Sequence, residues 1–365
     1  MKPRIVLSGV NFTEMGPLSV FREALSSLAA AYADRYEIIA LVHSKSLFDI
    51  PDVTYMEYPE IKSSWLKRLH FEYRACRSLS EKLKPYLWFA MHDMTPNVQA
   101  NVRAVYCHNP APFYPFSLSE ALFDWKFGLF TLLYRFLYRI NIRSNNLVVV
   151  QQDWLRTEFK SRYGLLNVVV AHPSVDSLVI SKTTRQPDSC APYRFFYPVY
   201  PRTFKNIEQV LRATQRLERH GFNRFELWLT MNGTETPYAA KLAREYSSLT
   251  TVRWLGLLPR VEVIRLYTEA DCLLFPSKLE TWGMPITEFK VTGKPILAAD
   301  LPYAHETVGN YAQAAFFSIF SDVQLAAMMK QAAEGGVLFG PVSGQQVTQP
   351  FSQNWLELWE ILLRS

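Results

Sequence analysis

Short apolar runs alternate with amphipathic stretches along the first half of the chain. Consecutive apolar residues predict buried strands, and apolar residues spaced three and four apart predict helices. The predicted strands are 5–10, 37–43, 86–91, 104–106 and 147–150, and the predicted helices are 17–32 and 64–83. Strands separated by helices indicate a parallel sheet covered by helices.

The second half repeats this alternation. Its predicted strands are 194–199, 225–231, 251–255, 272–275 and 295–299, with helices at 205–220, 238–248 and 261–268. The stretch 177–192 is rich in Ser, Thr and Pro and is the best candidate for a linker, and 354–363 predicts an aromatic, amphipathic helix. The fold class is therefore α/β, with a parallel sheet in each half.

Length and composition fit two globular domains. A chain of 365 residues exceeds what one core usually supports. The net charge of +6 suits a phosphorylated substrate, an anionic membrane surface or nucleic acid. The first residues predict a strand rather than a signal peptide, and no apolar stretch approaches the roughly 20 residues that span a bilayer. We therefore expect a cytoplasmic protein.

The run from 275 to 295, FPSKLETWGMPITEFKVTGKP, carries the strongest chemical signal. It predicts the end of a strand, a tight loop and a short helix. Gly283 lets the backbone approach a ligand closely. Pro285 suits the first turn of the helix, and Gly293 suits the residue just past its end. A helix N-terminus behind a glycine favours phosphate.

Glu280 and Glu288 stand eight positions apart in this run. Carboxylates repel phosphate but accept hydrogen bonds well from the vicinal hydroxyls of sugars and ribose. A phosphate flanked by two polyols describes a nucleotide sugar. The alternative is that both acids favour the first turn of a helix through its dipole.

The run resembles the E-x7-E signature of the retaining GT-B glycosyltransferases of the large family four. The positions in register are Pro276, Ser277, Glu280, Gly283, Pro285, Glu288, Gly293 and Pro295, while Thr281 replaces the usual glycine. The resemblance implies that Glu280 binds hydroxyls of the donor sugar and that Glu288 binds the ribose. It also implies donor contacts from Thr281, Trp282, Gly283, Met284 and Pro285, and contacts near the base from Gly256 and Leu257.

The resemblance further implies a GT-B fold, in which two Rossmann-like parallel-sheet domains have a cleft between them. We expect an N-terminal acceptor-binding domain at 1–176 and a C-terminal nucleotide-sugar-binding domain at 177–350. Residues 351–365 would form a helix that crosses back to the first domain.

Two cations follow the predicted strand 194–199, where open α/β sheets bind ligands. The resemblance implies that Lys205 and Arg202 face the diphosphate and stabilise the charge of the leaving group. Family members space these cations five residues apart, and Tyr200 stands five before Lys205, so Lys205 fits better than Arg202. A solvated basic loop is the alternative for both.

Two further positions lie in the first half. Gly16 follows the first strand, and its position resembles that of the family's glycine-rich loop near the donor phosphates. The alternative is an ordinary strand–helix turn. His108 matches the family's histidine near the donor sugar better than His92 does. A buried histidine with satisfied hydrogen bonds is the alternative for each.

Metal and nucleic acid are not expected as partners. The sequence has no Asp-x-Asp motif flanked by apolar residues, no His/Cys cluster with metal spacing and no nucleic-acid module. Basic and aromatic residues do interleave in 62–84 and 113–143. This composition suits an anionic membrane surface, or equally a helix packed on the sheet with a solvated basic face.

The resemblance implies a glycosyltransferase that moves a hexosyl or deoxyhexosyl group from a nucleotide-sugar donor to an acceptor hydroxyl with retention, without a cofactor. The expected context is synthesis of a bacterial surface polysaccharide (lipopolysaccharide, O-antigen or capsule) or of a lipid-linked glycan, peripherally at the inner face of the cytoplasmic membrane. The alternatives are a GT-B phosphorylase, a sugar-nucleotide epimerase and a catalytically silent nucleotide-binding subunit.

Overall fold

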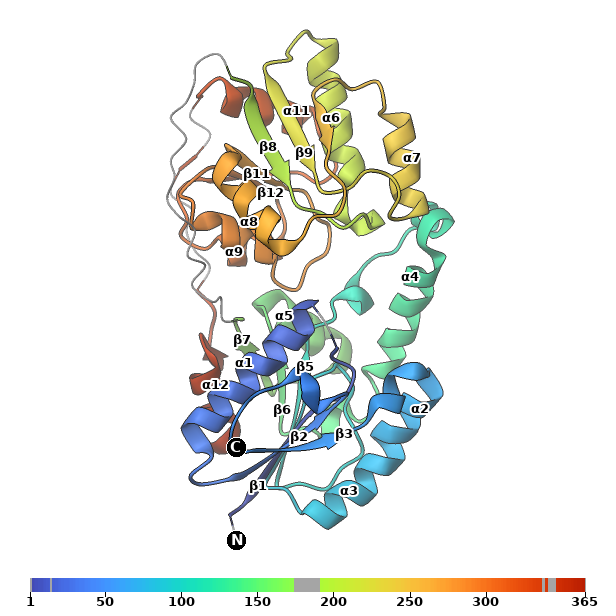
Figure 1. Cartoon of the computed structure of the whole chain (residues 1–365), viewed down its shortest axis with the longest axis vertical. Helices are drawn as coiled ribbons and strands as arrows, with labels where there is room; N and C mark the ends of the chain where they lie inside the picture. Colours follow the sequence, from blue (N-terminus) through green and yellow to red (C-terminus); the bar gives the residue numbers. More distant parts are fainter. Residues whose placement is uncertain (1, 14, 174–190, 337–338, 341–345, 365) are drawn as a thin grey trace. The chain divides into compact units, whose positions relative to one another are not determined.

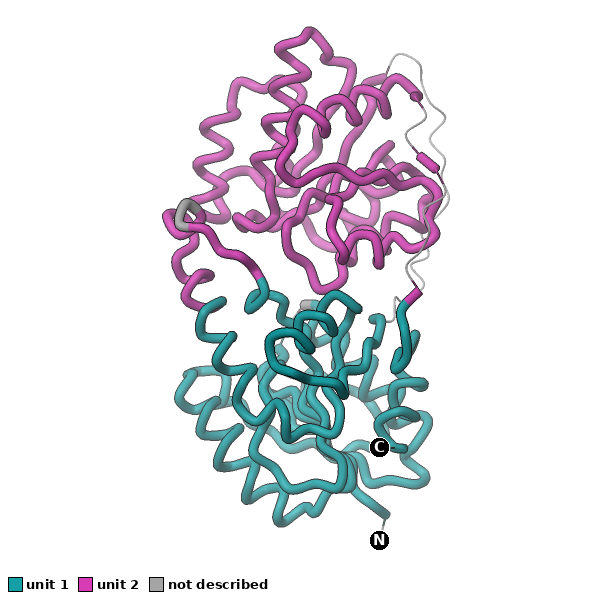
Figure 2. Tube along the Cα trace, turned by 180° about the vertical axis from the view of Figure 1, so that it is seen from behind, with its two compact units in different colours: residues 1–113, 131–174, 347–365 teal, residues 114–130, 175–346 magenta. Residues whose placement is uncertain are grey.

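The structure is a computed structural model that describes residues 2–13, 15–173, 191–336, 339–340 and 346–364. It divides into two compact units, coloured separately in Figure 2. Unit 1 comprises 1–113, 131–174 and 347–365, and unit 2 comprises 114–130 and 175–346. The sequence places residues 114–130 in the first domain, whereas their contacts group them with unit 2.

Unit 1 is built on a parallel sheet with the strand order β14-β7-β6-β5-β4-β1-β2-β3. The strands are β1 (Arg4–Gly9), β2 (Glu37–Val42), β3 (Val53–Glu57), β4 (Leu87–Ala90), β5 (Val102–Cys107), β6 (Leu147–Val150), β7 (Val168–Ala171) and β14 (Phe351–Ser352). The central strands are buried on both faces, which explains their uninterrupted apolar runs.

The core of unit 1 contains residues from both ends of the chain. Its helices are α1 (Met15–Tyr32), α2 (Trp65–His70), α3 (Cys76–Leu83), α5 (Asp153–Tyr163), α12 (Trp355–Arg364) and the second half of α4 (Leu118–Leu137). Helix α12 packs against α1 (Figure 1). The Trp359 ring meets Phe89 edge-on at 5.7 Å between centroids. The C-terminal helix is therefore part of the unit 1 core.

Unit 2 has a parallel sheet with the order β10-β9-β8-β11-β12-β13. The strands are β8 (Tyr193–Tyr197), β9 (Phe225–Leu229), β10 (Val252–Trp254), β11 (Cys272–Phe275), β12 (Ile296–Ala299) and β13 (Ala314–Phe317). Its helices are α6 (Ile207–Arg219), α7 (Pro237–Glu245), α8 (Arg260–Glu269), α9 (Met284–Lys290), α10 (Pro302–Val308) and α11 (Asp322–Ala333), and α6 packs against α11.

These elements confirm the α/β fold with two parallel-sheet domains, and every predicted strand is present. The predicted helix 64–83 forms as α2 and α3 joined by a π-helical turn, Phe71–Ala75. Not predicted from the sequence were β3, β7, β13, β14, α4, α5, α10 and α11. Residues 177–190 of the proposed linker lie outside the described residues.

Candidate functional site

The connectivity of unit 2 defines where a ligand can bind. The chain forms β8, adds β9 and β10 on one side, and then returns to add β11, β12 and β13 on the other. The order in which strands are added to the sheet therefore reverses between the parallel neighbours β8 and β11, where Phe196 pairs with Leu273. Ligands of open parallel sheets bind at the carboxyl ends of the strands at such a reversal.

Lys205 and Glu280 meet at this point. Lys205 ends the 3-10 turn after β8, and Glu280 lies in the loop after β11. The Nζ atom of Lys205 is 2.5 Å from Oε1 of Glu280, and the two side chains are 21% and 16% exposed. The backbone N–H of Lys278 donates to the carbonyl of Phe204 at 2.8 Å and joins the two loops. This partly buried pair is screened less by water than a surface ion pair.

Two buried tyrosines hold these loops in place. The Tyr197 hydroxyl donates to the carbonyl oxygen of Lys205 at 2.8 Å, and the Tyr303 hydroxyl donates to that of Ser277 at 2.7 Å. Burial raises the pKa of both phenols well above the usual range, and the charge of Glu280 raises it further. Both phenols therefore stay protonated and keep donating.

Glu288 lies on α9 and is 5% exposed. Its Oε2 accepts a hydrogen bond from the Tyr267 hydroxyl at 2.9 Å, and its Oε1 is 2.8 Å from Nη2 of Arg260. Burial, and then the charge of Glu288, raises the pKa of Tyr267 well above its usual range, so this phenol remains a donor. The Arg260 side chain is 66% exposed and can swing into solvent, which would leave Oε1 to a ligand hydroxyl.

Gly283 occupies a position that only glycine fits easily. Its φ of 90° lies in the left-handed region. A Cβ there would also lie 3.3 Å from the Phe275 ring and 3.4 Å from Ile286. Helix α9 begins at the next residue, Met284, with Pro285 in its first turn. The predicted loop-to-helix transition is therefore confirmed, and it places the α9 N-terminus after β11.

Trp282 is anchored just before this helix. Its Nε1 donates to the Thr287 hydroxyl at 2.9 Å, and its carbonyl accepts from the Thr307 hydroxyl. Thr281, in the preceding bend, is half-buried. The loop that carries Glu280 is thus tied to α9 and α10 by side-chain hydrogen bonds.

Gly256 and Leu257 follow β10 on the outer side of the sheet. Gly256 has a φ of 73°, and a Cβ at this position would lie 3.1 Å from Nδ2 of Asn232 in the loop after β9. Leu257 is exposed. Both remain predictions for contacts with the base.

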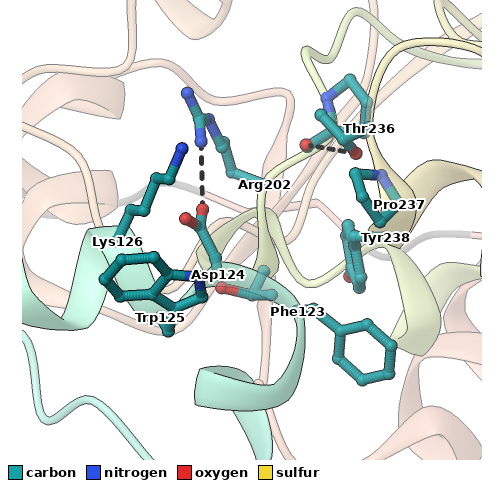
Figure 3. Close-up of a pocket in the computed structure, with 10 residues that line it drawn as sticks. Phe123, Asp124, Trp125, Lys126, Arg202, Thr236, Pro237 and Tyr238 are labelled. Atoms are coloured by element: carbon teal, nitrogen blue, oxygen red, sulfur yellow. Dashed lines mark hydrogen bonds and ion pairs between the residues drawn. The ribbon is translucent and has the colours of Figure 1, made fainter.

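Arg202 lines a pocket of unit 2 (Figure 3). Its Nη1 is 3.0 Å from Oδ2 of Asp124, at the point where the backbone of α4 departs from helical geometry. The pocket has a volume of about 260 Å³ and is lined by Phe123, Asp124, Trp125, Lys126, Pro201, Arg202, Thr203, Thr236, Pro237 and Tyr238. Arg202 is therefore paired with Asp124, while Lys205 is paired with Glu280.

The unit 1 candidates lie at the carboxyl edge of their own sheet. His108 follows β5, its Nε2 is 3.7 Å from Oδ2 of Asp93, and its ring lies 5.7 Å from that of Phe12. Gly16 lies in the first turn of α1 rather than in a loop, with open space where a Cβ would point. The roles of both toward a donor remain predictions.

His92 belongs to a buried polar cluster. Strands β1 and β4 pair with Ser8 opposite Ala90, which brings Nε2 of His92 to 3.1 Å from Oγ of Ser8. An Nη2 atom of Arg68 lies 3.5 Å from Nδ1 and donates to the His92 carbonyl at 2.8 Å. Burial, and then the charge of Arg68, lowers the pKa of His92 well below its usual range, so the ring is neutral. These contacts favour the alternative of a satisfied buried histidine.

Glu72 completes this cluster from the π-helical turn between α2 and α3. It is fully buried, and its Oε1 lies 3.4 Å from Nε2 of His92. Burial raises the pKa of Glu72 to about 8, against the opposing effect of Arg68. Because the sequence shows only a glutamate on a basic helix, its burial could not be predicted.

The Glu72→Gln variant should change the pH dependence of stability. In the folded chain Glu72 keeps its proton up to about pH 8, whereas in the unfolded chain it loses it near pH 4.5. The free energy of unfolding of the wild type therefore has its full value below pH 4.5 and decreases as the pH rises to about 8. We expect the variant to gain about 3–5 kcal/mol in the free energy of unfolding relative to the wild type across this range. Urea unfolding at several pH values measures this difference, and parallel profiles would contradict it.

Among 2–13, 15–173, 191–336, 339–340 and 346–364, no three or more His, Cys, Asp or Glu side chains are grouped to hold a metal ion. Within the same ranges, no helix combines the length and apolar character needed to cross a membrane.

Several residues that shape the site could not be singled out from the sequence. Tyr197, Tyr303 and Tyr267 resemble ordinary core aromatics, and only the tertiary structure shows that their hydroxyls hold the site. Arg260 is the first residue of α8, and no sequence motif marks it. Asp124 lies in α4, a helix that was not predicted, and no motif marks this residue.

Part of the second half matches a known family model. The model of the family described as "Glycosyl transferases group 1" matches residues 191–336. The O-antigen chain mannosyltransferase B of Escherichia coli is 29% identical over 183 residues, which cover 47% of this chain and 47% of that protein. The match thus spans about half the length of this curated relative.

Structural comparisons extend the likeness to both sheets. The lipopolysaccharide outer core galactosyltransferase WaaB matches with a TM-score of 0.64 at 12% identity, over 91% of this chain and 90% of that chain. The Anabaena protein HepE, solved in complex with UDP-glucose, matches with a TM-score of 0.61 at 16% identity, over 91% and 90%. Residues 191–336 thus match the family of group 1 glycosyl transferases, and the chain has the GT-B fold that its E-x7-E run implies.

Proposed function

We propose that this chain transfers a sugar from a nucleotide-sugar donor to an acceptor hydroxyl with retention of the anomeric configuration. The pairing of Lys205 with Glu280 at the strand reversal of unit 2 carries the proposal. A cation and a carboxylate at this one point match the two unlike parts of such a donor, its diphosphate and its sugar.

The ion pair would open when the donor binds. The diphosphate competes with Glu280 for the Lys205 ammonium, because phosphate oxygens are strong acceptors for a charged donor. Glu280, released from the lysine, then accepts hydrogen bonds from sugar hydroxyls. Each group is kept partly buried and oriented before binding, which lowers the cost of ordering it.

Transfer with retention is proposed as a front-face displacement assisted by the leaving diphosphate. The bond from the anomeric carbon to the diphosphate oxygen breaks, and the acceptor oxygen bonds to the same face of the sugar. The acceptor proton passes to the departing phosphate oxygen. Lys205 stabilises the negative charge that develops there, and the N–H groups at the start of α9 favour the same charge.

Glu288 is proposed to bind the ribose. Its Oε2 is held by Tyr267, and its Oε1 is covered by the exposed Arg260. A ribose hydroxyl that donates to Oε1 would replace the contact with Arg260, whose side chain is 66% exposed and whose charge is largely screened by water. His108, Gly16 and Arg202 remain proposed donor contacts through the family resemblance alone.

The acceptor is proposed to be a bacterial surface polysaccharide or a lipid-linked glycan. Support comes from the names of the relatives, an O-antigen chain mannosyltransferase and a lipopolysaccharide core galactosyltransferase. The net charge of +6 is compatible with a phosphate-bearing acceptor.

The experiment begins with a thermal-shift screen of UDP-, GDP- and dTDP-sugars, mannosyl donors included, since a ligand that binds the native state raises Tm. The donor that stabilises most is then incubated with the protein and lipid-linked glycans. We expect release of nucleoside diphosphate that depends on the acceptor, and a retained anomeric configuration by NMR. Sugar 1-phosphate formed from inorganic phosphate would instead indicate a phosphorylase, a changed nucleotide sugar an epimerase, and binding without turnover a silent subunit.

A further inference from the structure

The outward face of α4 in unit 1 is apolar, which reverses the usual pattern of a surface helix. Its hydroxyl-bearing residues Thr131 and Tyr134, and Tyr138 just past the helix end, are buried, and Arg135 is half-buried. The side chains on the opposite face are between 39% and 57% exposed, and they are Leu132, Leu133, Phe136 and, just past the helix end, Ile140. The unit 2 half of the same helix continues the three- and four-residue spacing with exposed Trp125 and Leu129.

Helix α2 extends this apolar face within unit 1. Its Trp65 and Leu66 are exposed, and the Trp65 ring meets that of Tyr134 edge-on at 6.0 Å. This ring contact joins the two helices, and Figure 1 shows α2 near the lower end of α4. We call these six exposed side chains the apolar face: Trp65, Leu66, Leu132, Leu133, Phe136 and Ile140. Exposed apolar side chains gathered in this way mark an interaction surface.

The charged residues within the segments that carry the apolar face are basic. The sequence has no Asp or Glu from 61 to 71 or from 125 to 152. The exposed Lys and Arg residues in these segments are Lys62 and Lys67 near α2, Lys126 in the unit 2 part of α4, and Arg139 and Arg143 after α4. Glu60, in the turn that precedes α2, is the acidic residue closest in sequence. The surface thus joins bulky apolar groups to positive charge.

We propose that the apolar face docks unit 1 on an anionic membrane surface. Trp, Phe and Leu side chains insert at the boundary of headgroups and acyl chains, and Lys and Arg at the rim attract anionic lipids. A protein partner would need no such excess of one charge around an apolar centre. The inference stands on these exposed residues and does not depend on the proposed transfer reaction.

The test measures sedimentation of the purified protein with vesicles of phosphatidylcholine, alone or mixed with phosphatidylglycerol. We expect the wild type to sediment with the mixed vesicles and to be released by high salt. The L133S/F136S variant should bind about tenfold less. Leu166, 82% exposed elsewhere in unit 1, provides the matched control L166S, which should bind as the wild type does.

A second variant tests the charge without altering the apolar face. Arg139→Glu, at an exposed position, should weaken binding to the mixed vesicles and leave the weak binding to pure phosphatidylcholine unchanged. Circular dichroism establishes that each variant is folded. Failure of the wild type to bind mixed vesicles, or equal binding by L133S/F136S and L166S, would overturn the proposal. Self-association that L133S/F136S abolishes, without vesicle binding, would assign the face to a protein contact instead.

Discussion

Glu280→Ala is expected to lower kcat/KM for sugar transfer by about 100-fold or more. The carboxylate lies at the strand reversal of unit 2, held 2.5 Å from Lys205 and oriented by loops that Tyr197 and Tyr303 fix. Because the carboxylate is already oriented, little conformational entropy is lost when it binds the reacting sugar. Its removal should therefore mainly destabilise the transition state. Steady-state kinetics with the donor identified by the screen measures the effect.

The control for this variant is Glu334→Ala, at the end of α11, where Glu334 pairs only loosely with Lys330 at 3.9 Å. It should transfer sugar at the wild-type rate. A near-normal rate for Glu280→Ala would remove this carboxylate from the mechanism. Unchanged thermal stabilisation by the donor, together with lost transfer, would locate its contribution in the reaction rather than in binding.

Lys205→Met is expected to lower kcat/KM by about 100-fold to 1,000-fold and to weaken nucleoside diphosphate binding. The substitution removes the cation from the turn after β8 and leaves Glu280 partly buried without its partner, which adds repulsion against the diphosphate. Affinity for the nucleoside alone should change little, because it does not reach this cation. Calorimetric titration with both ligands separates the two effects.

The coupling between the two residues provides a sharper check. Because Lys205 and Glu280 are in direct contact, their effects should not add, and the Lys205→Met/Glu280→Gln double variant should lose less than the product of the single losses. Lys330→Met is the matched control on the same unit. Equal affinity of wild type and Lys205→Met for a nucleoside diphosphate would contradict the assigned role.

The sequence predicts the buried strands well because parallel strands covered on both faces are continuous apolar runs. Strands β6 and β11 have the predicted bounds. Strand β3, at the edge of its sheet, is only half-buried and has a mixed pattern, so no apolar run marks it. Helix α4 was missed because its outward face is apolar, which removes the two-sided pattern that predicts a surface helix.

In the candidate site, too, some features could be predicted from the sequence and others could not. Gly283, Pro285 and the glutamates could be found from local chemistry and family resemblance. The pairing of Lys205 with Glu280 depends on the order of strands in the sheet, because the two residues are 75 positions apart. The pairings of Arg202 with Asp124 and of Glu288 with Arg260 likewise come from tertiary packing, which no periodicity along the chain reveals.

A crystal structure with the intact nucleotide sugar bound tests the central claim most directly. The account predicts that the Lys205–Glu280 pair has opened, with Nζ of Lys205 about 2.7–2.9 Å from a diphosphate oxygen and the Glu280 carboxylate on a sugar hydroxyl. A diphosphate bound elsewhere, with the Lys205–Glu280 pair still closed, would contradict it.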